Sequence, residues 1–192
     1  MLQSLARLLV VSLCFAASAA FAANPQVELD TTAGKIRIEL YPDAAPKTVQ
    51  NFLDYVKAGH YNGTQFHRVI AGFMIQGGGY TEDYQQKPTR APVPIESQQS
   101  VKAGLSNVPG TVSMARTGDP NSATAQFFIN VKDNDFLNAA NSRDGNGYAV
   151  FGKVVSGMDV VDKIVAVPTG DKGMHQNVPA TPVTIKKATV EK

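Results

Sequence analysis

The sequence predicts a mainly β, single-domain protein whose short antiparallel strands form a closed barrel or a sandwich. Runs in which apolar and polar residues alternate recur along the chain, separated by glycine, proline and asparagine. Only two segments carry the apolar spacing of an amphipathic helix, so strand–helix–strand units are not expected. About 170 residues follow an N-terminal leader, which is enough for one well-buried domain.

The first element is a β-hairpin. In residues 27–31, apolar or threonine side chains alternate with Glu and Asp, and in residues 36–40, Ile and Leu alternate with Arg and Glu. Thr32-Ala33-Gly34 between them supplies turn residues. We therefore expect two paired strands with one buried face.

A helix is expected next. Pro46 suits a first helical turn and Gly59 suits the position after a helix end. The apolar residues between them have i, i+3, i+4, i+7 spacing; they are Val49, Phe52, Leu53 and Val56.

Residues 66–70 predict a strand that carries a cation at an unusual position. Phe66, Arg68 and Ile70 alternate with His67 and Val69, so Arg68 should lie on the face opposite His67. Arginine stays charged at any working pH and offers five fixed donors. Flanked by apolar residues, such a cation suits a pocket for a polar, uncharged group, although an edge strand can also hold an Arg in water. Gly72 would permit a bend after this strand.

The remaining elements follow in order. Tyr80–Leu105 is rich in Gln, Pro and Ser and predicts a long surface segment. In residues 126–131, Phe127 and Ile129 share an apolar face with Val131, so Gln126 and Phe128 should face outward. A second helix is expected over Ser156–Val167, before Pro168, and a final strand over Val183–Val190.

The N-terminus predicts a secretory signal peptide, residues 1–22, that leaves a mature domain of residues 23–192. Arg7 precedes the apolar run Leu8–Phe15, and Ala20-Phe21-Ala22 is a small-x-small cleavage site. Cys14 lies inside the apolar run, and Leu13 before it does not suit a lipoprotein signal. We expect cleavage after Ala22 and a periplasmic protein. An uncleaved membrane anchor is the alternative.

Composition limits the classes of partner. The formal net charge is +2, and no basic stripe indicates nucleic acid binding. The only cysteine lies in the leader, so the mature chain should have no disulfide. The three histidines do not have metal-ligand spacing, and no G-x-S-x-G motif indicates a hydrolase. We expect a monomer without metal or cofactor and without membrane contact after cleavage.

Four blocks resemble a known family. Phe66–Gly78 resembles the signature of the cyclophilin-type peptidyl-prolyl cis-trans isomerases, and Gly110–Arg116, Ser122–Asn130 and Tyr148–Val154 resemble its next segments in the same order. The resemblance covers Gln26 to Val190. It is greatest to the exported, periplasmic cyclophilins of Gram-negative bacteria.

The resemblance implies an eight-stranded closed antiparallel barrel with a helix over each open end and a substrate groove outside. It implies isomerisation of X-Pro bonds during the folding of exported proteins, with proline-containing unfolded or partly folded polypeptides as substrates. The family's catalytic Arg falls on Arg68. Its substrate-contact positions fall on Phe73, Met74, Gln76, Ala115, Arg116, Gln126, Phe128, Phe136, Leu137 and Tyr148.

The sequence departs from the family pattern in four places. Ala71 replaces a proline before the bend, and Tyr148 stands where many members have His. Arg116 and Thr117 replace smaller or amide residues on the groove rim. Phe136 stands where many members have the Trp whose indole donates to cyclosporin, so we expect weak cyclosporin binding. A protein that binds proline peptides without catalysis, such as a holdase, is the alternative function, and Arg68 argues against it.

Overall fold

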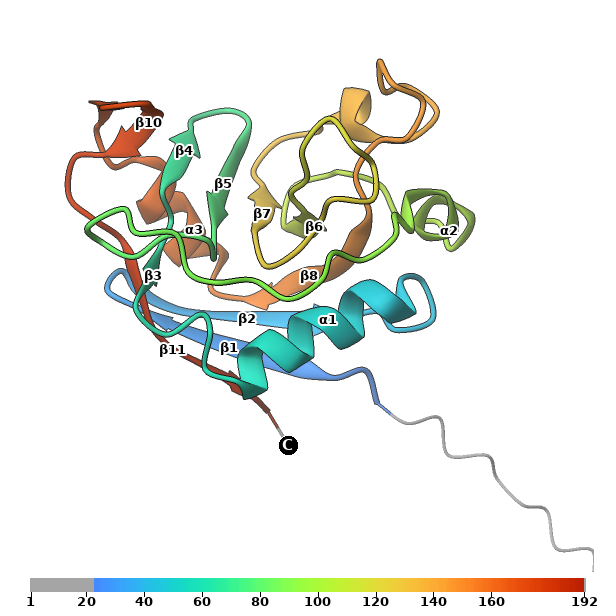
Figure 1. Ribbon diagram of the computed structural model, residues 1–192, viewed down its shortest axis with the longest axis horizontal. Coiled ribbons are helices and arrows are strands. Elements are labelled where there is room, and N and C mark those ends of the chain that lie inside the picture. The colour runs from blue at the N-terminus through green and yellow to red at the C-terminus, as the bar shows by residue number, and fades with distance from the viewer. Residues whose placement is uncertain (1–22, 192) are drawn as a thin grey trace, which may run out of the picture.

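The computed structural model describes residues 23–191, and the predicted leader therefore lies outside the described residues (Figure 1). In chain order the elements are β1 (Gln26–Thr31), β2 (Gly34–Leu40), α1 (Pro46–Lys57), β3 (Thr64–Gln65), β4 (Arg68–Ile70), β5 (Met74–Gly77), α2 (Ser97–Lys102), β6 (Thr111–Met114), β7 (Phe127–Asn130), the 3-10 turn η1 (Asp135–Leu137), β8 (Val150–Ser156), α3 (Met158–Val165), β9 (Thr169–Lys172), β10 (His175–Pro179) and β11 (Thr184–Val190).

The mainly β, antiparallel prediction is confirmed, but the barrel is only partly closed. Among residues 23–191, nine strands form one curled sheet in the order β3-β11-β1-β2-β8-β6-β7-β5-β4. The two edge strands, β3 and β4, are separated in the chain only by Phe66 and His67. The strand predicted over residues 66–70 is thus split, and this accounts for nine strands where eight were expected. β3 pairs with β11 and β4 with β5, so this segment joins the two ends of the sheet.

The first hairpin has the predicted register. Val27 lies opposite Ile38, and Leu29 lies opposite Ile36. All four side chains are fully buried. The alternation of apolar and acidic residues in β1 therefore places one face of the hairpin in the core and leaves the charged face toward solvent.

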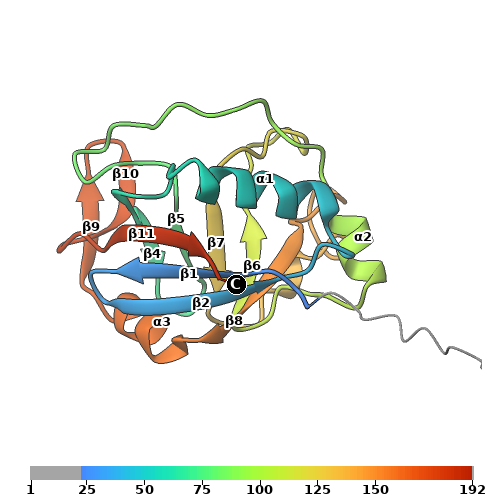
Figure 2. The same ribbon diagram turned by 90° about the horizontal axis from the view of Figure 1, so that it is seen from below.

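Helices α1 and α3 cover opposite sides of the curled sheet, as Figure 2 shows. Helix α1 begins at Pro46, and Gly59 follows its end with φ of +67°. The apolar stripe of α1 packs into the core, and so do Val160, Val161 and Ile164 of α3. Both predicted helices are therefore confirmed, with α3 shorter at each end than the sequence indicated.

A third helix, α2, lies in the long segment that was expected to be irregular. Glu96, just before α2, is buried and accepts hydrogen bonds from the backbone amides of Lys47 and Thr48 at 3.1 and 2.8 Å. These amides belong to the first turn of α1, and Ala45 at the helix start makes no side-chain cap. The long segment thus caps α1 from a distance, which satisfies donors that the helix itself leaves unpaired.

Strands β9 and β10 form a separate two-stranded sheet that the sequence pattern did not predict. Apart from the buried Val178 and Pro179, their residues are polar or glycine and mostly exposed, so they lack the alternating pattern of a half-buried strand. The hairpin lies beside β4, as Figure 1 shows. Within residues 23–191, no helix is both long enough and apolar enough to cross a membrane.

Candidate active site

The candidate site lies on the face of β4, β5 and β7 that points away from the core. Alternation sends Val69, Ile75 and Ile129 inward, where they are buried in the core cluster. Arg68 pairs with Gln76 across β4 and β5, and Gln76 pairs with Phe128 across β5 and β7. The cation, the amide and the aromatic ring therefore share one surface.

A glycine turn places the next residues of this surface. Gly72 has φ of +70°, a left-handed conformation that a side chain disfavours, and it reverses the chain between β4 and β5. Phe73 precedes β5, while Met74 and Gln76 lie on one face of it. The predicted bend is confirmed, and it lets Phe73, Met74 and Gln76 approach the same cavity.

The cavity has an apolar floor. Met74, Phe128 and Leu137 are buried together, separate from the main core. Phe73, Ala115, Tyr148 and Ile70 are partly buried against them. The resulting hollow has a volume of about 370 Å³. Because the family resemblance implies that the substrate's proline lies here, we call it the proline pocket; its lining residues are Arg68, Phe73, Met74, Gln76, Ala115, Arg116, Phe128, Leu137 and Tyr148.

One polar chain borders this apolar floor. Nη1 of Arg68 donates to Oε1 of Gln76 at 3.3 Å, and Nε2 of Gln76 donates to Oε1 of Gln126 at 2.9 Å. Within residues 23–191, none of the ion pairs includes Arg68. The guanidinium is thus oriented by a neutral amide and keeps its full charge toward the cavity.

Nine of the eleven predicted site residues line the proline pocket, and the other two lie beside it. Gln126 is linked to the pocket through Gln76 and lines an adjoining hollow with His67. Phe136 is 57% exposed, and its ring stacks on Phe73 with 5.6 Å between centroids. It lines a second adjoining hollow.

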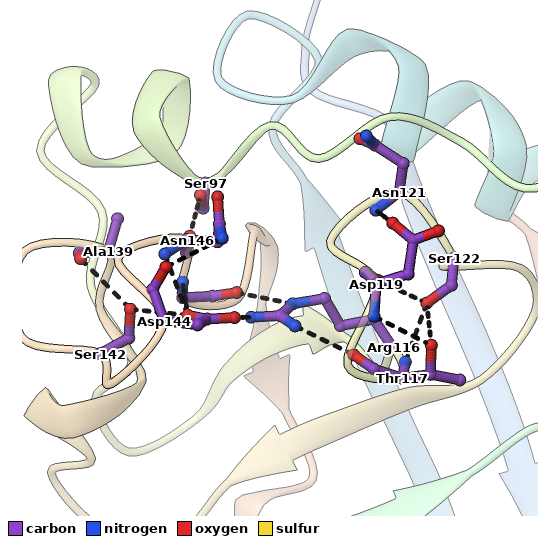
Figure 3. A network of polar contacts seen from close by, with 11 residues as sticks. Ser97, Arg116, Thr117, Asp119, Asn121, Ser122, Ala139, Ser142, Asp144 and Asn146 are labelled. Carbon is purple, nitrogen blue, oxygen red and sulfur yellow. Dashed lines mark hydrogen bonds and ion pairs between the residues drawn. The ribbon is translucent and has the colours of Figure 1, made fainter.

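Arg116 is close to the pocket but already has partners. Figure 3 shows its guanidinium reaching Asp144 on the loop that follows η1. Its side chain is 5% exposed, and it also donates to the carbonyl oxygens of Gly147 and Thr117. Arg116 therefore forms part of the wall and has few donors left for a ligand.

His67 lies beside Arg68 and not on the opposite face, because the strand is interrupted at Phe66 and His67. The expected alternation was wrong at this point. His67 is buried, and its Nδ1 atom has no partner among the described residues. Burial lowers the pKa of His67 to about 4, and the neighbouring His175 acts in the same direction. The ring is therefore neutral at physiological pH, which leaves Arg68 as the cation at this end of the pocket.

Alternation along the strand would place Asn130 on the same face as Phe128, but its side chain does not reach the groove. It is fully buried, and its side chain donates to Oγ1 of Thr111 at 3.0 Å and Oδ1 of Asn107 at 3.1 Å. This network of amides ties β6 and β7 to the segment before η1. Within residues 23–191, no group of three or more His, Cys, Asp or Glu side chains could hold a metal ion.

Comparison with known proteins decides the family. The sequence model described as "Cyclophilin type peptidyl-prolyl cis-trans isomerase/CLD" matches residues 26–190. The chain belongs to the cyclophilin-type peptidyl-prolyl cis-trans isomerases. It is 56% identical over 165 residues to peptidyl-prolyl cis-trans isomerase B of Escherichia coli, which covers 85% of this chain and 98% of that protein. It is 52% identical over 190 residues to peptidyl-prolyl cis-trans isomerase A of Dickeya dadantii, and this match covers 98% of this chain and 97% of that protein.

The fold of this cyclophilin also matches solved structures. A cyclophilin-type isomerase of Cryptosporidium parvum superposes with a TM-score of 0.70 at 27% identity, over 88% of this chain and 98% of that one. A second structure of that protein was solved in the presence of the dipeptide Ala-Pro, with a TM-score of 0.69 and 27% identity over 87% and 99% of the chains. The family resemblance and the isomerase class predicted from the sequence are confirmed.

Proposed function

We propose that this cyclophilin accelerates X-Pro rotation in exported polypeptides of the periplasm, with Arg68 as the catalytic residue. The observation that carries the mechanism is the placement of Arg68: a guanidinium without an ion-pair partner among the described residues, hydrogen-bonded to Gln76, at the edge of a buried apolar floor. A role in binding alone would not need a cation at this position.

The reaction needs neither a nucleophile nor a cofactor. Resonance in an X-Pro amide resists rotation with a barrier of about 18–20 kcal/mol. When the amide twists, this resonance is lost and the proline nitrogen regains a lone pair. A guanidinium donor near that nitrogen, or on the neighbouring carbonyl, stabilises the twisted state more than the planar one.

The apolar floor supplies the remaining requirement, which is to hold the ring while the bond rotates. Met74, Phe128 and Leu137 are shielded from water and present only carbon and sulfur to the cavity. A proline ring seated there is immobilised, and the low-polarity surroundings strengthen the contact with Arg68. An acceleration of about 10⁵ corresponds to roughly 7 kcal/mol, so one charge-assisted contact must act together with this restraint.

Export is supported by the N-terminal residues. Arg7, the apolar run and the Ala20-Phe21-Ala22 site form the pattern of a cleavable signal. The match to the Dickeya relative extends over 190 residues, so it includes most of the leader as well as the domain. The match to the E. coli relative is shorter and spans 165 residues, or 85% of this chain.

Two measurements test the proposal separately. Intact mass of the protein in periplasmic extract should correspond to a chain that begins at Ala23; a mass that retains Cys14, or a lipid adduct on it, contradicts the export claim. Purified residues 23–192 should speed cis-trans exchange of an X-Pro tetrapeptide in a protease-free NMR assay. Peptide binding without faster exchange would favour the holdase alternative.

A further inference from the structure

Two hollows adjoin the proline pocket on different sides. One, of about 330 Å³, shares Arg68 and Gln76 with it. The other, of about 870 Å³, shares Arg116, Leu137 and Tyr148 with it. The proline pocket therefore lies between them. A chain that places its proline in the pocket must extend over the neighbouring surface in both directions, because a peptide continues on either side of the ring.

The larger hollow, which we call the loop hollow, is lined on one side by residues 141–144 of the loop 138–147; its other lining residues are Arg116, Thr117, Gly118, Phe136, Leu137 and Tyr148. This loop leaves the site after Leu137 and returns at Tyr148, and the Tyr148 amide donates to the Leu137 carbonyl at 2.9 Å. Both residues line the proline pocket. Whatever fixes the loop therefore also fixes two walls of the catalytic cavity.

One ion pair ties the loop to the wall of the pocket, and Ser97 and Asn107 also donate hydrogen bonds to the loop, to Asn146 and Asn138. Nη2 of Arg116 lies 2.5 Å from Oδ2 of Asp144, and Nε donates to the Gly147 carbonyl at 2.9 Å. The guanidinium carbon lies 4.6 Å from the centroid of the Tyr148 ring, a cation–π contact. Figure 3 shows Arg116 between the 117–122 turn and the loop.

Asp144 is bound equally firmly from within the loop. Its Oδ1 accepts from the amides of Asn146 and Gly147 at 3.0 and 3.2 Å, and from Oγ of Ser142 at 3.1 Å. The Asn146 amide and the Arg116 guanidinium hold the pKa of Asp144 well below its usual value. Gly147 has φ of +64°, and a Cβ there would lie 2.6 Å from the Leu137 carbonyl, so the return path is closely packed.

The charges of the loop hollow do not cancel. Arg116 and Asp144 neutralise each other, whereas Arg143 is exposed and takes part in none of the ion pairs within residues 23–191. Arg143 lines the hollow together with Phe136, whose exposed ring forms an apolar shelf. A side chain with a carbon stem and a negative end matches this surface.

We propose that the loop hollow is a substrate subsite for a residue flanking the proline, that it favours an acidic side chain there, and that the Arg116–Asp144 ion pair is the positioning device that builds it. The proposal rests on the isomerase activity of the family and does not depend on the role of Arg68. A purely structural ion pair would affect all substrates equally. A pair that forms a subsite wall must also change which substrates are preferred.

The test compares two peptide series, one with Ala, Glu or Lys before proline and one with the same residues after it. The readout is kcat/KM for Glu relative to Lys, with kcat and KM resolved, measured at low and at high salt. In one of the two series, the one whose varied residue reaches the loop hollow, wild type should prefer Glu over Lys by about threefold at low salt. High salt should reduce this preference.

The variants should move this ratio in opposite directions. Asp144→Asn leaves the Arg116 charge uncompensated and should raise the ratio about threefold, whereas Arg116→Gln leaves Asp144 unpaired and should lower it about threefold. Arg143→Gln should bring the ratio close to one. Because Arg143 is exposed, this variant keeps the test valid even where a change in the half-buried Arg116–Asp144 pair impairs folding.

The chain offers a matched control. Arg90 and Asp54 form another Arg–Asp pair, 3.2 Å apart, with Arg90 over the Tyr55 ring, and none of the three lines the proline pocket or its adjoining hollows. Arg90→Gln and Asp54→Asn should leave the Glu/Lys ratio unchanged. The proposal is overturned if Arg143→Gln leaves the ratio at its wild-type value, or if the Arg116 and Asp144 variants lower kcat/KM for every peptide by the same factor.

Discussion

Arg68 and Gln76 lie directly opposite each other on β4 and β5, and Nη1 of Arg68 donates to Oε1 of Gln76 at 3.3 Å. Nε2 of the same Gln76 amide donates to Oε1 of Gln126. A neutral amide therefore orients the guanidinium without neutralising it. This distinction between orienting a charge and cancelling it leads to the first prediction.

Gln76→Glu should lower kcat/KM by about 10- to 100-fold. The substitution preserves shape but places a carboxylate against Arg68, and the resulting ion pair competes with the twisted amide for the guanidinium. Exchange NMR on one X-Pro peptide measures the effect, with Gln98→Glu on the exposed side of α2 as the control. Wild-type activity in Gln76→Glu would mean that the charge of Arg68 need not be free.

Glu96→Ala should reduce the free energy of unfolding by about 1–3 kcal/mol. The change removes the acceptor for two first-turn amides of α1 and for Oγ1 of Thr48, and it leaves the two Thr48 donors buried without a partner. Urea unfolding gives the difference, and exposed Gln98→Ala is the control. A loss below about 0.5 kcal/mol would show that α1 does not need this distant cap.

Protonation of His67 should destabilise the fold in acid. Its pKa is about 4 in the folded protein and about 6.5 in an unfolded chain. Above pH 6.5 both states are neutral and the stability is complete. As the pH falls from 6.5 to 4, the unfolded chain binds the proton first, so about 3 kcal/mol is lost.

Urea midpoints of wild type and His67→Gln, measured between pH 7.5 and 4, test this prediction. The stability advantage of wild type over the variant should shrink by about 3 kcal/mol across that range. Parallel pH profiles for the two proteins would show that His67 is protonated without cost in the folded state.

Phe136→Trp should strengthen cyclosporin binding about tenfold, or by roughly 1–2 kcal/mol. Phe136 is exposed and stacks on Phe73 at the pocket edge, so an indole can replace it without repacking the core and adds the N–H donor that the phenyl ring lacks. Titration calorimetry compares the two dissociation constants. Equal constants would show that the missing donor does not limit affinity.

The elements that could be predicted from sequence are those with regular apolar spacing. The first hairpin, α1 and α3 all follow from alternation or helical periodicity, whereas the groove position of Arg68 follows from the family resemblance. Helix α2 and the β9–β10 hairpin could not be found this way, because short polar segments have no periodicity.

The parts of the site that sequence missed depend on contacts between distant residues. The strand break at Phe66 and His67 depends on pairing with two different strands, β11 and β5, at opposite ends of the sheet. Likewise, Arg116 and Asp144 meet only because a glycine-rich loop folds back to Tyr148. Arg116 was assigned to the groove by family position, but the contacts that occupy it could not be read from its neighbours in sequence.

The most direct test of the account is kcat/KM for Arg68→Ala, measured by protease-free exchange NMR with circular dichroism as the folding control. Arg37→Ala, another strand arginine that pairs with Glu28 away from the pocket, is the matched control. Arg68→Ala should stay folded and bind peptide nearly as well as wild type, and its kcat/KM should fall by a factor of about 10²–10³. Arg68→Lys should restore little, because an ammonium lacks the planar fork. A folded Arg68→Ala protein that keeps more than about half of its activity would contradict the central claim.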